Sequence, residues 1–233
     1  MQKTGKKAIV KEMFDGIAHR YDFLNHFLSL GIDNYWRKKA LLHLKSFKNP
    51  YILDVASGTG DFAIAALKYN PSKIIGIDLS IEMLKKGDEK LLKKGLDRVI
   101  QLQPGDSENL AFENETFDAV TVAFGVRNFE NLIQGLKEMN RVLRKGGRVI
   151  ILEFSKPSSK FFRLLFNFYF FYILPLIGKL VSRHSKAYTY LPESVDTFPC
   201  GKDFLAIMNH SGFRSVSAQP LTWGIATIYT GVK

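Results

Sequence analysis

Two carboxylates and a glycine turn are the features of this chain that point most directly to a ligand site. Asp54 ends an apolar run, and Gly58 and Gly60 follow it within a turn of small residues. A second apolar run ends on Asp78. A glycine turn lets a ligand approach the backbone closely, and an acid after the second strand of such a unit lies where ribose hydroxyls would be. This spacing predicts a site for a ligand with an adenosine-like end.

The glycine turn alone does not decide which nucleotide binds. With Ala63, the two glycines satisfy the dinucleotide pattern G-x-G-x-x-G/A, and Asp78 follows at about the 20-residue spacing of NAD-binding proteins. Asp54, however, would repel a pyrophosphate and suits an ammonium group. Asp106 follows a third short apolar run and suits an adenine amino group. Acids are also common as helix caps and turn residues, but three at successive strand ends favour a cationic nucleoside such as S-adenosylmethionine. An NAD-dependent oxidoreductase is the alternative from another class.

Around these residues the sequence predicts strands and helices in alternation. This alternation predicts an α/β fold, a doubly wound, mostly parallel seven-stranded sheet with helices on both faces and ligands at its carboxyl edge. We expect a basic helix end and a glycine stop at 141–147, and an antiparallel hairpin at one edge of the sheet. The expected elements are helices at Lys7–His19 and Asn34–Leu44, strand–turn–helix units at 51–69, 73–94, 98–110 and 117–145, a strand at Arg148–Phe154, a helix at Asp203–His210, and strands at Arg214–Gln219 and Gly224–Val232.

The composition indicates an intracellular protein of one domain. A chain of 233 residues is long enough to bury a sizeable core. Cys200 is the single cysteine, which rules out an intrachain disulfide and suits a reducing compartment. The first twenty residues are charged and lack the apolar core of a secretory signal. We therefore expect a cytoplasmic, bacterial-type enzyme.

The net charge of +11 is concentrated around one apolar segment. Between Glu153 and Glu193 the chain has no acidic residue but several lysines and arginines, and residues 161–178 are almost all apolar. The uncharged part is shorter than the roughly 20 residues of a membrane span, and a proline and a glycine interrupt it. Two interpretations of residues 161–178 stay open. They form a core helix packed on the sheet, or they surround a hydrophobic ligand and contact a membrane surface.

Nucleic acid is the other usual partner of a basic chain. A cytosine-methylating enzyme needs a cysteine after the fourth strand, and Cys200 lies far beyond that point. An adenine-methylating enzyme would carry Asp/Asn-Pro-Pro-aromatic there, whereas this chain has residues 123–128, Ala-Phe-Gly-Val-Arg-Asn. We therefore predict no nucleic-acid partner.

Several motifs are more specific than the glycine turn. They lie at Phe14–Asn25, Gly105–Leu110, Phe124–Asn128 and Tyr190–Ser194. With them the chain resembles, over essentially its whole length, the quinone-biosynthesis C-methyltransferase family that acts on demethylmenaquinol and on the equivalent ubiquinol precursor. It departs from the family at Asp33, where a histidine is common. The resemblance implies a Rossmann-like class I methyltransferase fold that uses S-adenosylmethionine without a metal.

The resemblance also implies a role for each residue of the cofactor site. These roles are ammonium binding for Asp54, methionine binding for Gly58, Thr59 and Gly60, ribose binding for Asp78, adenine binding for Asp106 and Ser107, backbone contact near the sulfur for Ala123, and either an adenine wall or a core position for Met83.

The catalytic residues implied by the resemblance come from two regions. Arg127 and Asn128 are placed beside the donor methyl group, and Arg127 is assigned to the phenolate oxygen, directly or through water. Tyr21 and Asp22 are expected to line the ring pocket from an N-terminal lid. An arginine is a poor base because its pKa exceeds about 12.

The implied reaction is C-methylation of a prenylated demethylmenaquinol to menaquinol, with 2-methoxy-6-polyprenyl-benzoquinol as the alternative substrate. His19 and His26 are alternative bases, since histidine titrates near neutral pH.

The expected organisation is one methyltransferase domain. Residues 1–45 form the helical lid, 51–155 the cofactor-binding core, 156–200 an insert for a prenyl tail or a membrane surface, and 201–233 the last helix and hairpin. We expect peripheral attachment to the inner face of the membrane, and a homodimer is compatible with this organisation.

Overall fold

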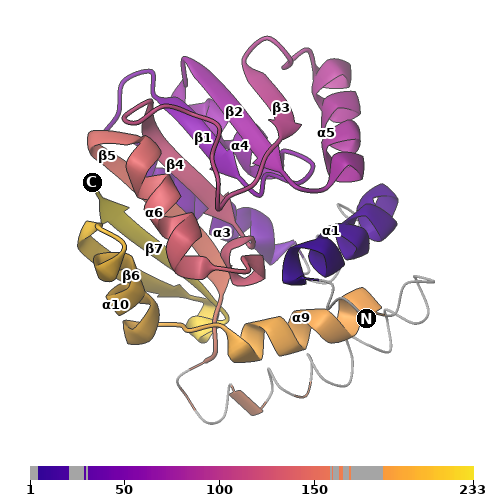
Figure 1. The fold of residues 1–233 in the computed structure, drawn as a ribbon, viewed down its shortest axis with the longest axis vertical. Coiled ribbons are helices and arrows are strands. Elements are labelled where there is room, and N and C mark those ends of the chain that lie inside the picture. Colours follow the sequence, from indigo (N-terminus) through magenta and orange to yellow (C-terminus); the bar gives the residue numbers. More distant parts are fainter. Residues whose placement is uncertain are drawn as a thin grey trace.

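The computed structural model describes residues 5–20, 29, 31–157, 159, 163, 164, 168 and 186–233. Its centre is one seven-stranded sheet in the order β3-β2-β1-β4-β5-β7-β6 (Figure 1). The first five strands of that order, β3, β2, β1, β4 and β5, run parallel to one another. Strand β7 runs antiparallel to β5, and β6 runs antiparallel to β7. The predicted doubly wound sheet with an edge hairpin is therefore confirmed. The strands are β1 (Tyr51–Val55), β2 (Lys73–Asp78), β3 (Ile100–Pro104), β4 (Phe117–Ala123), β5 (Leu143–Phe154), β6 (Arg214–Leu221) and β7 (Ala226–Val232).

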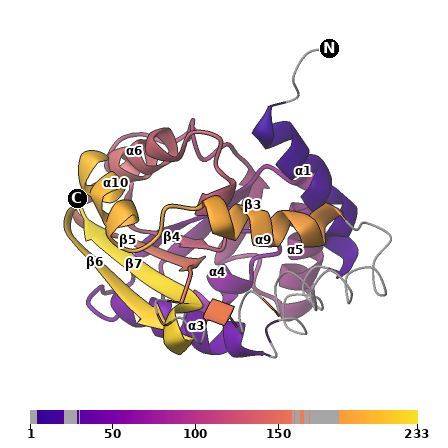
Figure 2. The ribbon, with the colours of Figure 1, turned by 90° about the horizontal axis from the view of Figure 1, so that it is seen from below.

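Helices cover both faces of the sheet and its carboxyl edge. Helices α6 and α10 pack on one face, and α3, α4 and α5 pack on the other (Figure 2). Helices α1 and α9 lie side by side across the carboxyl ends of the strands (Figure 1). The helices are α1 (Lys6–Ile17), α3 (Ile32–Leu41), α4 (Asp61–Ala66), α5 (Ile81–Lys94), α6 (Leu132–Val142), α9 (Lys186–Thr197) and α10 (Lys202–His210), with short 3₁₀ turns that include η1 (Ala18–Arg20) and η4 (Val126–Asn128).

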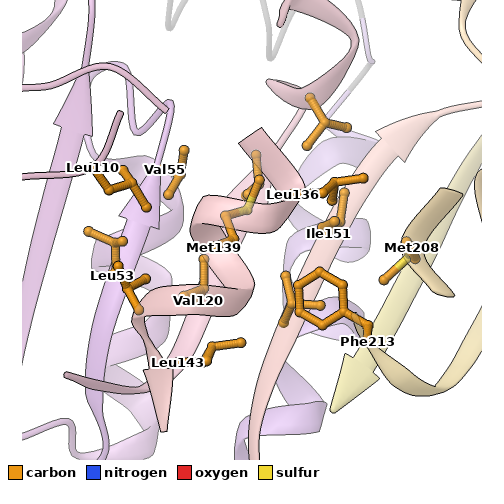
Figure 3. Close-up of a cluster of buried hydrophobic side chains, with 14 of the residues drawn as sticks. Leu53, Val55, Leu110, Val120, Leu136, Met139, Leu143, Ile151, Met208 and Phe213 are labelled. Carbon is orange, nitrogen blue, oxygen red and sulfur yellow. The ribbon is translucent and has the colours of Figure 1, made fainter. Parts of the chain in front are cut away.

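The face under α6 shows why the elements hold together. Leu136 and Met139 of α6 are fully buried and lie among the inward side chains of the strands, including Val120 and Ile151 (Figure 3). Burying side chains of this size stabilises the fold by about 1.5–3 kcal/mol each. The result is a rigid sheet that fixes the positions of its strand ends.

The prediction of a helix in the unit at 98–110 is wrong. Strand β3 is followed by turns and by an isolated bridge between Asp106 and Asn109. Side chains of α6 hold this segment instead: Leu110 N donates to Glu138 Oε2 over 2.9 Å, and Arg141 Nη2 donates to Leu110 O over 2.8 Å. These long-range bonds satisfy backbone groups that a helix would otherwise have paired.

The boundary between α6 and β5 also differs from the prediction. The helix ends at Val142, and β5 begins at Leu143 rather than at Arg148. Leu143 pairs with Phe117 of β4, and the register shifts before the next pair. The expected glycine stop therefore lies inside the strand, where Gly146 has φ +76°.

Some predictions fall on residues that the structure does not describe. Tyr21, Asp22 and His26 lie outside the described residues, as does most of the predicted insert at 156–200. Among the helices that the structure describes, none is long and apolar enough to cross a membrane.

Candidate functional site

Two hollows meet at the carboxyl edge of the sheet, at the ends of β1 and β4. The larger one encloses about 700 Å³ including its mouth, and the smaller one about 310 Å³. Both are lined by Ala56, Gly58 and Ala123, so they form one continuous site. Strands β1 and β4 are neighbours at the point where the strand order reverses, which is where ligands bind in open α/β sheets.

The two loops that separate the hollows approach each other unusually closely. A Cβ atom on Gly125 would lie 2.6 Å from the Cβ atom of Ala56, so only glycine fits there. Ala56 and Phe124, the residues that follow β1 and β4, have φ angles of +53° and +59°. Left-handed backbone at residues with side chains costs about 1–3 kcal/mol and concentrates at functional sites.

Asp54 is buried in the floor of the smaller hollow, with 1% of its surface exposed. Its Oδ1 accepts a hydrogen bond of 2.6 Å from Thr121 Oγ, whereas its Oδ2 has no hydrogen-bond partner among the described residues. Burial raises the pKa of Asp54 to about 7, and the charge of Asp78 acts in the same direction. A cation beside a buried carboxylate stabilises its charged form, and the ammonium group of a ligand would be such a cation.

Arg37 lines the same hollow from α3, although no motif in the sequence predicted a role for it. Its guanidinium stacks over the Phe124 ring at 5.7 Å, and its Nε forms an ion pair of 3.5 Å with Oδ2 of the buried Asp33, without a hydrogen bond. The hollow therefore holds an arginine and an aspartate that both have unused hydrogen-bonding atoms. This pair of opposite charges fits the two ends of a zwitterionic amino acid.

Asp78 lies between the larger hollow and the glycine turn. Its Oδ2 accepts from Gly58 N over 2.8 Å and its Oδ1 accepts from Ser80 N over 2.9 Å, so the carboxylate is oriented from behind. Burial raises its pKa, and the charge of Asp15 on α1 acts in the same direction. Asp78 also lines the larger hollow, the position that ribose binding requires.

Thr59 and Gly60 contribute differently from each other. Thr59 lines the smaller hollow, and its hydroxyl oxygen accepts from Lys90 Nζ over 3.0 Å. Lys90 Nζ also lies 2.7 Å from Asp61 Oδ1. Gly60 lines neither hollow; its φ of +81° forms the turn that starts α4.

The predicted adenine-binding pair is divided. Ser107 lines the larger hollow, but Asp106 does not. Asp106 Oδ2 lies 2.7 Å from Lys7 Nζ of α1, and Asp106 Oδ1 accepts from Glu108 N over 2.9 Å. Lys7 also lies 3.0 Å from Glu108 Oε2. Helix α1 is thus tied to the segment after β3 by a lysine that holds the predicted adenine ligand.

Arg127 does not line either hollow. Its Nη1 lies 2.7 Å from Oε1 of Glu153, which is fully buried, and donates a short hydrogen bond to Phe124 O. Its Nε donates to Ser194 Oγ over 3.3 Å. The guanidinium therefore braces the loop after β4 against β5 and α9.

Asn128 does line the larger hollow. Its Oδ1 accepts a hydrogen bond of 3.1 Å from the hydroxyl of Tyr190 on α9. Met83 also lines this hollow while it packs against Ile17 and Ala18, so both of its predicted roles agree with its position. His19 is exposed and lines neither hollow.

Four residues of the site were not predicted from the sequence. The available signals were a buried acid at the end of an otherwise apolar strand and the polar residues within the motif at Tyr190–Ser194. These residues are Arg37, Glu153, Tyr190 and Ser194.

The sheet order and the reversed seventh strand are those of the fold of class I S-adenosylmethionine-dependent methyltransferases, and the site lies at the carboxyl edge of that sheet. Solved structures share this fold. A methyltransferase of this class from Thermotoga maritima covers 95% of the chain with a TM-score of 0.67 at 19% identity, and 99% of that structure is covered. The cyclase SpnF covers 99% of the chain with a TM-score of 0.64 at 14% identity, and 97% of it is covered, so the fold alone does not fix the reaction.

Residues 1–233 match the model of the ubiE/COQ5 methyltransferase family, and the chain belongs to that family. The demethylmenaquinone methyltransferase of Bacteroides fragilis is 46% identical over 231 residues, which are 98% of this chain and 94% of that protein. The ubiquinone/menaquinone biosynthesis C-methyltransferase UbiE of Geotalea daltonii is 48% identical over 232 residues, which are 99% of this chain and 98% of that protein. The resemblance found in the motifs is confirmed, and the chain is a methyltransferase rather than an oxidoreductase.

Proposed function

We propose that this methyltransferase uses S-adenosylmethionine to methylate a ring carbon of a prenylated demethylmenaquinol, which yields menaquinol. The observation that carries the proposal is the smaller hollow, where Asp54 Oδ2 and Arg37 Nε are buried without hydrogen-bond partners among the described residues. The ammonium and carboxylate of a methionine group would complete both. The Asp54 carboxylate would repel a pyrophosphate, whereas it suits the ammonium group of this zwitterion.

The cofactor site extends from this hollow into the larger one. Asp78 is oriented to accept ribose hydroxyls, and Met83 and Ser107 line the space beyond it. Asp106 is proposed to bond the adenine amino group after its contact with Lys7 rearranges. Within the described part of the chain, no group of three or more His, Cys, Asp or Glu is arranged as a metal site.

S-adenosylmethionine supplies an already activated methyl group, so the protein must mainly align the ligands and stabilise the phenolate that forms as the quinol hydroxyl loses its proton. Asn128 lines the space where the quinol ring would meet the donor. Arg127 contributes its positive charge from behind the loop, and Tyr21 and Asp22 are proposed to line the ring pocket.

The names of the relatives point to two candidate substrates, a naphthoquinol and a benzoquinol. We propose the naphthoquinol. The relative from Bacteroides fragilis is named for demethylmenaquinone, whereas UbiE of Geotalea daltonii is named for both ubiquinone and menaquinone. The benzoquinol of the ubiquinone route is therefore the second candidate.

Methyl transfer from labelled S-adenosylmethionine tests the proposal. Reduced demethylmenaquinone, its oxidised form and a demethylated benzoquinol are compared, and we expect label on the reduced naphthoquinone. Asp78→Asn should weaken S-adenosylhomocysteine binding, while Asp88→Asn, a change of an exposed acid on α5, should not. Label on the benzoquinol alone would replace the proposed substrate, and no label on any ring would overturn the quinol assignment.

We also propose that the segment 156–200 holds the prenyl tail against an anionic membrane surface. Leu164 and Phe168 are 69% and 56% exposed, and the segment is rich in cations. Such cations contribute about 1 kcal/mol each near anionic lipid. Leu164→Ala/Phe168→Ala should reduce the use of long-tailed quinols more than short-tailed ones, and equal losses on both would contradict this role.

A further inference from the structure

Helix α9 is joined to the loop after β4 by two side chains on one of its faces. Tyr190 and Ser194 are four residues apart, so they lie one above the other on the helix. Tyr190 donates to Asn128 Oδ1 over 3.1 Å, and Ser194 accepts from Arg127 Nε over 3.3 Å. Two consecutive residues of the loop are therefore held by two successive turns of α9.

The bond from Tyr190 determines which end of the Asn128 amide faces the ligand. The carbonyl oxygen of Asn128 is engaged by Tyr190, which does not line the larger hollow, whereas Asn128 itself does. Asn128 Nδ2 makes no hydrogen bond with the described residues. It is also not one of the unbonded side-chain atoms that are completely buried, so it keeps some exposed surface. The two N–H groups of the amide are thus the polar atoms that Asn128 offers to the hollow.

We propose that Asn128 Nδ2 donates a hydrogen bond to the quinol oxygen as it becomes a phenolate, and that Tyr190 positions the amide for this bond. The inference rests on the proposed function, because it assigns the group that contacts the substrate oxygen. In the reaction the hydroxyl loses a proton, the ring carbon bonds to the methyl carbon as the sulfonium C–S bond breaks, and the same ring carbon then loses its hydrogen as a proton while the oxygen is reprotonated. One proton is released for each methyl group transferred.

The surroundings of Tyr190 keep it a donor. Burial raises the pKa of its hydroxyl, Glu153 acts in the same direction, and Arg127 acts against both. A neutral phenol bonded to the amide oxygen also polarises the amide, which strengthens its N–H groups as donors. Asn128 is the catalytic residue in this arrangement, and Tyr190 is a positioning residue.

Three variants test the arrangement with methyl transfer to reduced demethylmenaquinone. Asn128→Ala should lower kcat by about 100-fold or more, as the loss of an oxyanion donor does. Tyr190→Phe should lower kcat by about 5–10-fold, the worth of a neutral hydrogen bond, with KM nearly unchanged. The double variant should be no slower than Asn128→Ala, because Tyr190 acts through Asn128. Tyr69→Phe is the matched control, since Tyr69 packs against the core under α4.

A second readout does not depend on turnover. 1-Naphthol bound beside S-adenosylhomocysteine is titrated by its phenolate absorbance, and the wild-type protein should lower the naphthol pKa by about one unit or more. Asn128→Ala should abolish this shift and Tyr190→Phe should reduce it, while Tyr190→Phe keeps the wild-type affinity for S-adenosylhomocysteine. The shape of the pH–rate profile should also survive in Tyr190→Phe.

The outcomes separate this inference from the proposed function. Unchanged kcat and naphthol pKa in either single variant, with active wild-type protein, would overturn the inference alone. The loss of one limb of the pH–rate profile in Tyr190→Phe would also overturn it, because Tyr190 would then be the proton acceptor. A naphthol shift that depends on Asn128 in a protein that methylates neither quinol would support the donor and refute the proposed substrate.

Discussion

Glu153, at the end of β5, holds the guanidinium of Arg127, with Glu153 Oε1 2.7 Å from Arg127 Nη1 and the carboxylate completely buried. Glu153 Oε1 also accepts from Phe154 N over 2.8 Å, and its Oε2 accepts from Arg127 N over 3.3 Å. Arg127 in turn bonds Phe124 O, so the strained backbone after β4 is braced from β5. This ion pair links the sheet to the loop that carries Asn128.

Breaking this pair on one side should destabilise the protein strongly. Glu153→Gln leaves a buried guanidinium without its counter-charge, and we expect a loss of about 3–5 kcal/mol in the free energy of unfolding. Urea denaturation measures it. Arg127→Met/Glu153→Gln should recover much of the stability but not methyl transfer, because the positive charge is absent. A single variant within about 1 kcal/mol of wild type would contradict a structural role for the pair.

Asp54 should make cofactor binding depend on pH. Its pKa is about 7 in the ligand-free protein, and an ammonium group beside it would lower that value. Below pH 7 the ligand must therefore displace a proton, so affinity for S-adenosylhomocysteine should fall by up to about tenfold per pH unit and level off above pH 7. Asp54→Asn should bind more weakly with a flatter pH dependence. Calorimetry at several pH values checks this, and equal slopes in both proteins would refute the ammonium contact.

Arg37 should recognise the carboxylate end of the cofactor. Arg37→Met should weaken S-adenosylhomocysteine binding by about 10–100-fold, the worth of a charged hydrogen bond. Methylthioadenosine has no carboxylate for Arg37 to bind, so its affinity should stay within about twofold of wild type. Lys38→Met, a change of an exposed cation on the same helix, is the control. An equal loss for both ligands would show that Arg37 supports the fold instead.

Substitutions at Gly125 and Ala56 should have coupled effects on stability. Gly125→Ala would place a methyl group 2.6 Å from the Ala56 methyl, and we expect a loss of about 1–3 kcal/mol in stability and weaker cofactor binding. Ala56→Gly removes that methyl and relieves a residue with φ +53°, so the double variant should regain most of the loss. Thermal unfolding measures both effects. If Ala56→Gly gives no rescue, the clash lies elsewhere, for example with Val122.

The strand ends of the cofactor site were predictable because they depend on local patterns. Asp54 is next to the last residue of β1, Asp78 and Ala123 end β2 and β4, and parallel strands bring their carboxyl ends to one edge. The missing helix after β3 was not predictable in this way. Its segment is held by Glu138 and Arg141 of α6, and such long-range bonds leave no periodic signal in the segment itself.

The fold class, the family and the residues near the strand ends follow from the sequence alone, because hydrophobic period and short motifs are properties of neighbouring positions. The pairing of the polar residues depends on the packing of the folded chain. This packing brings Arg37 and Asp54 to one hollow, and it places Lys7 on Asp106, Glu153 on Arg127 and Tyr190 on Asn128. The three bonded pairs are 26 to 99 residues apart in the chain, at separations set by the packing of helices on the sheet rather than by any repeat. The chemistry of the site depends on these pairings, since they fix which charges are buried and which atoms face the ligand.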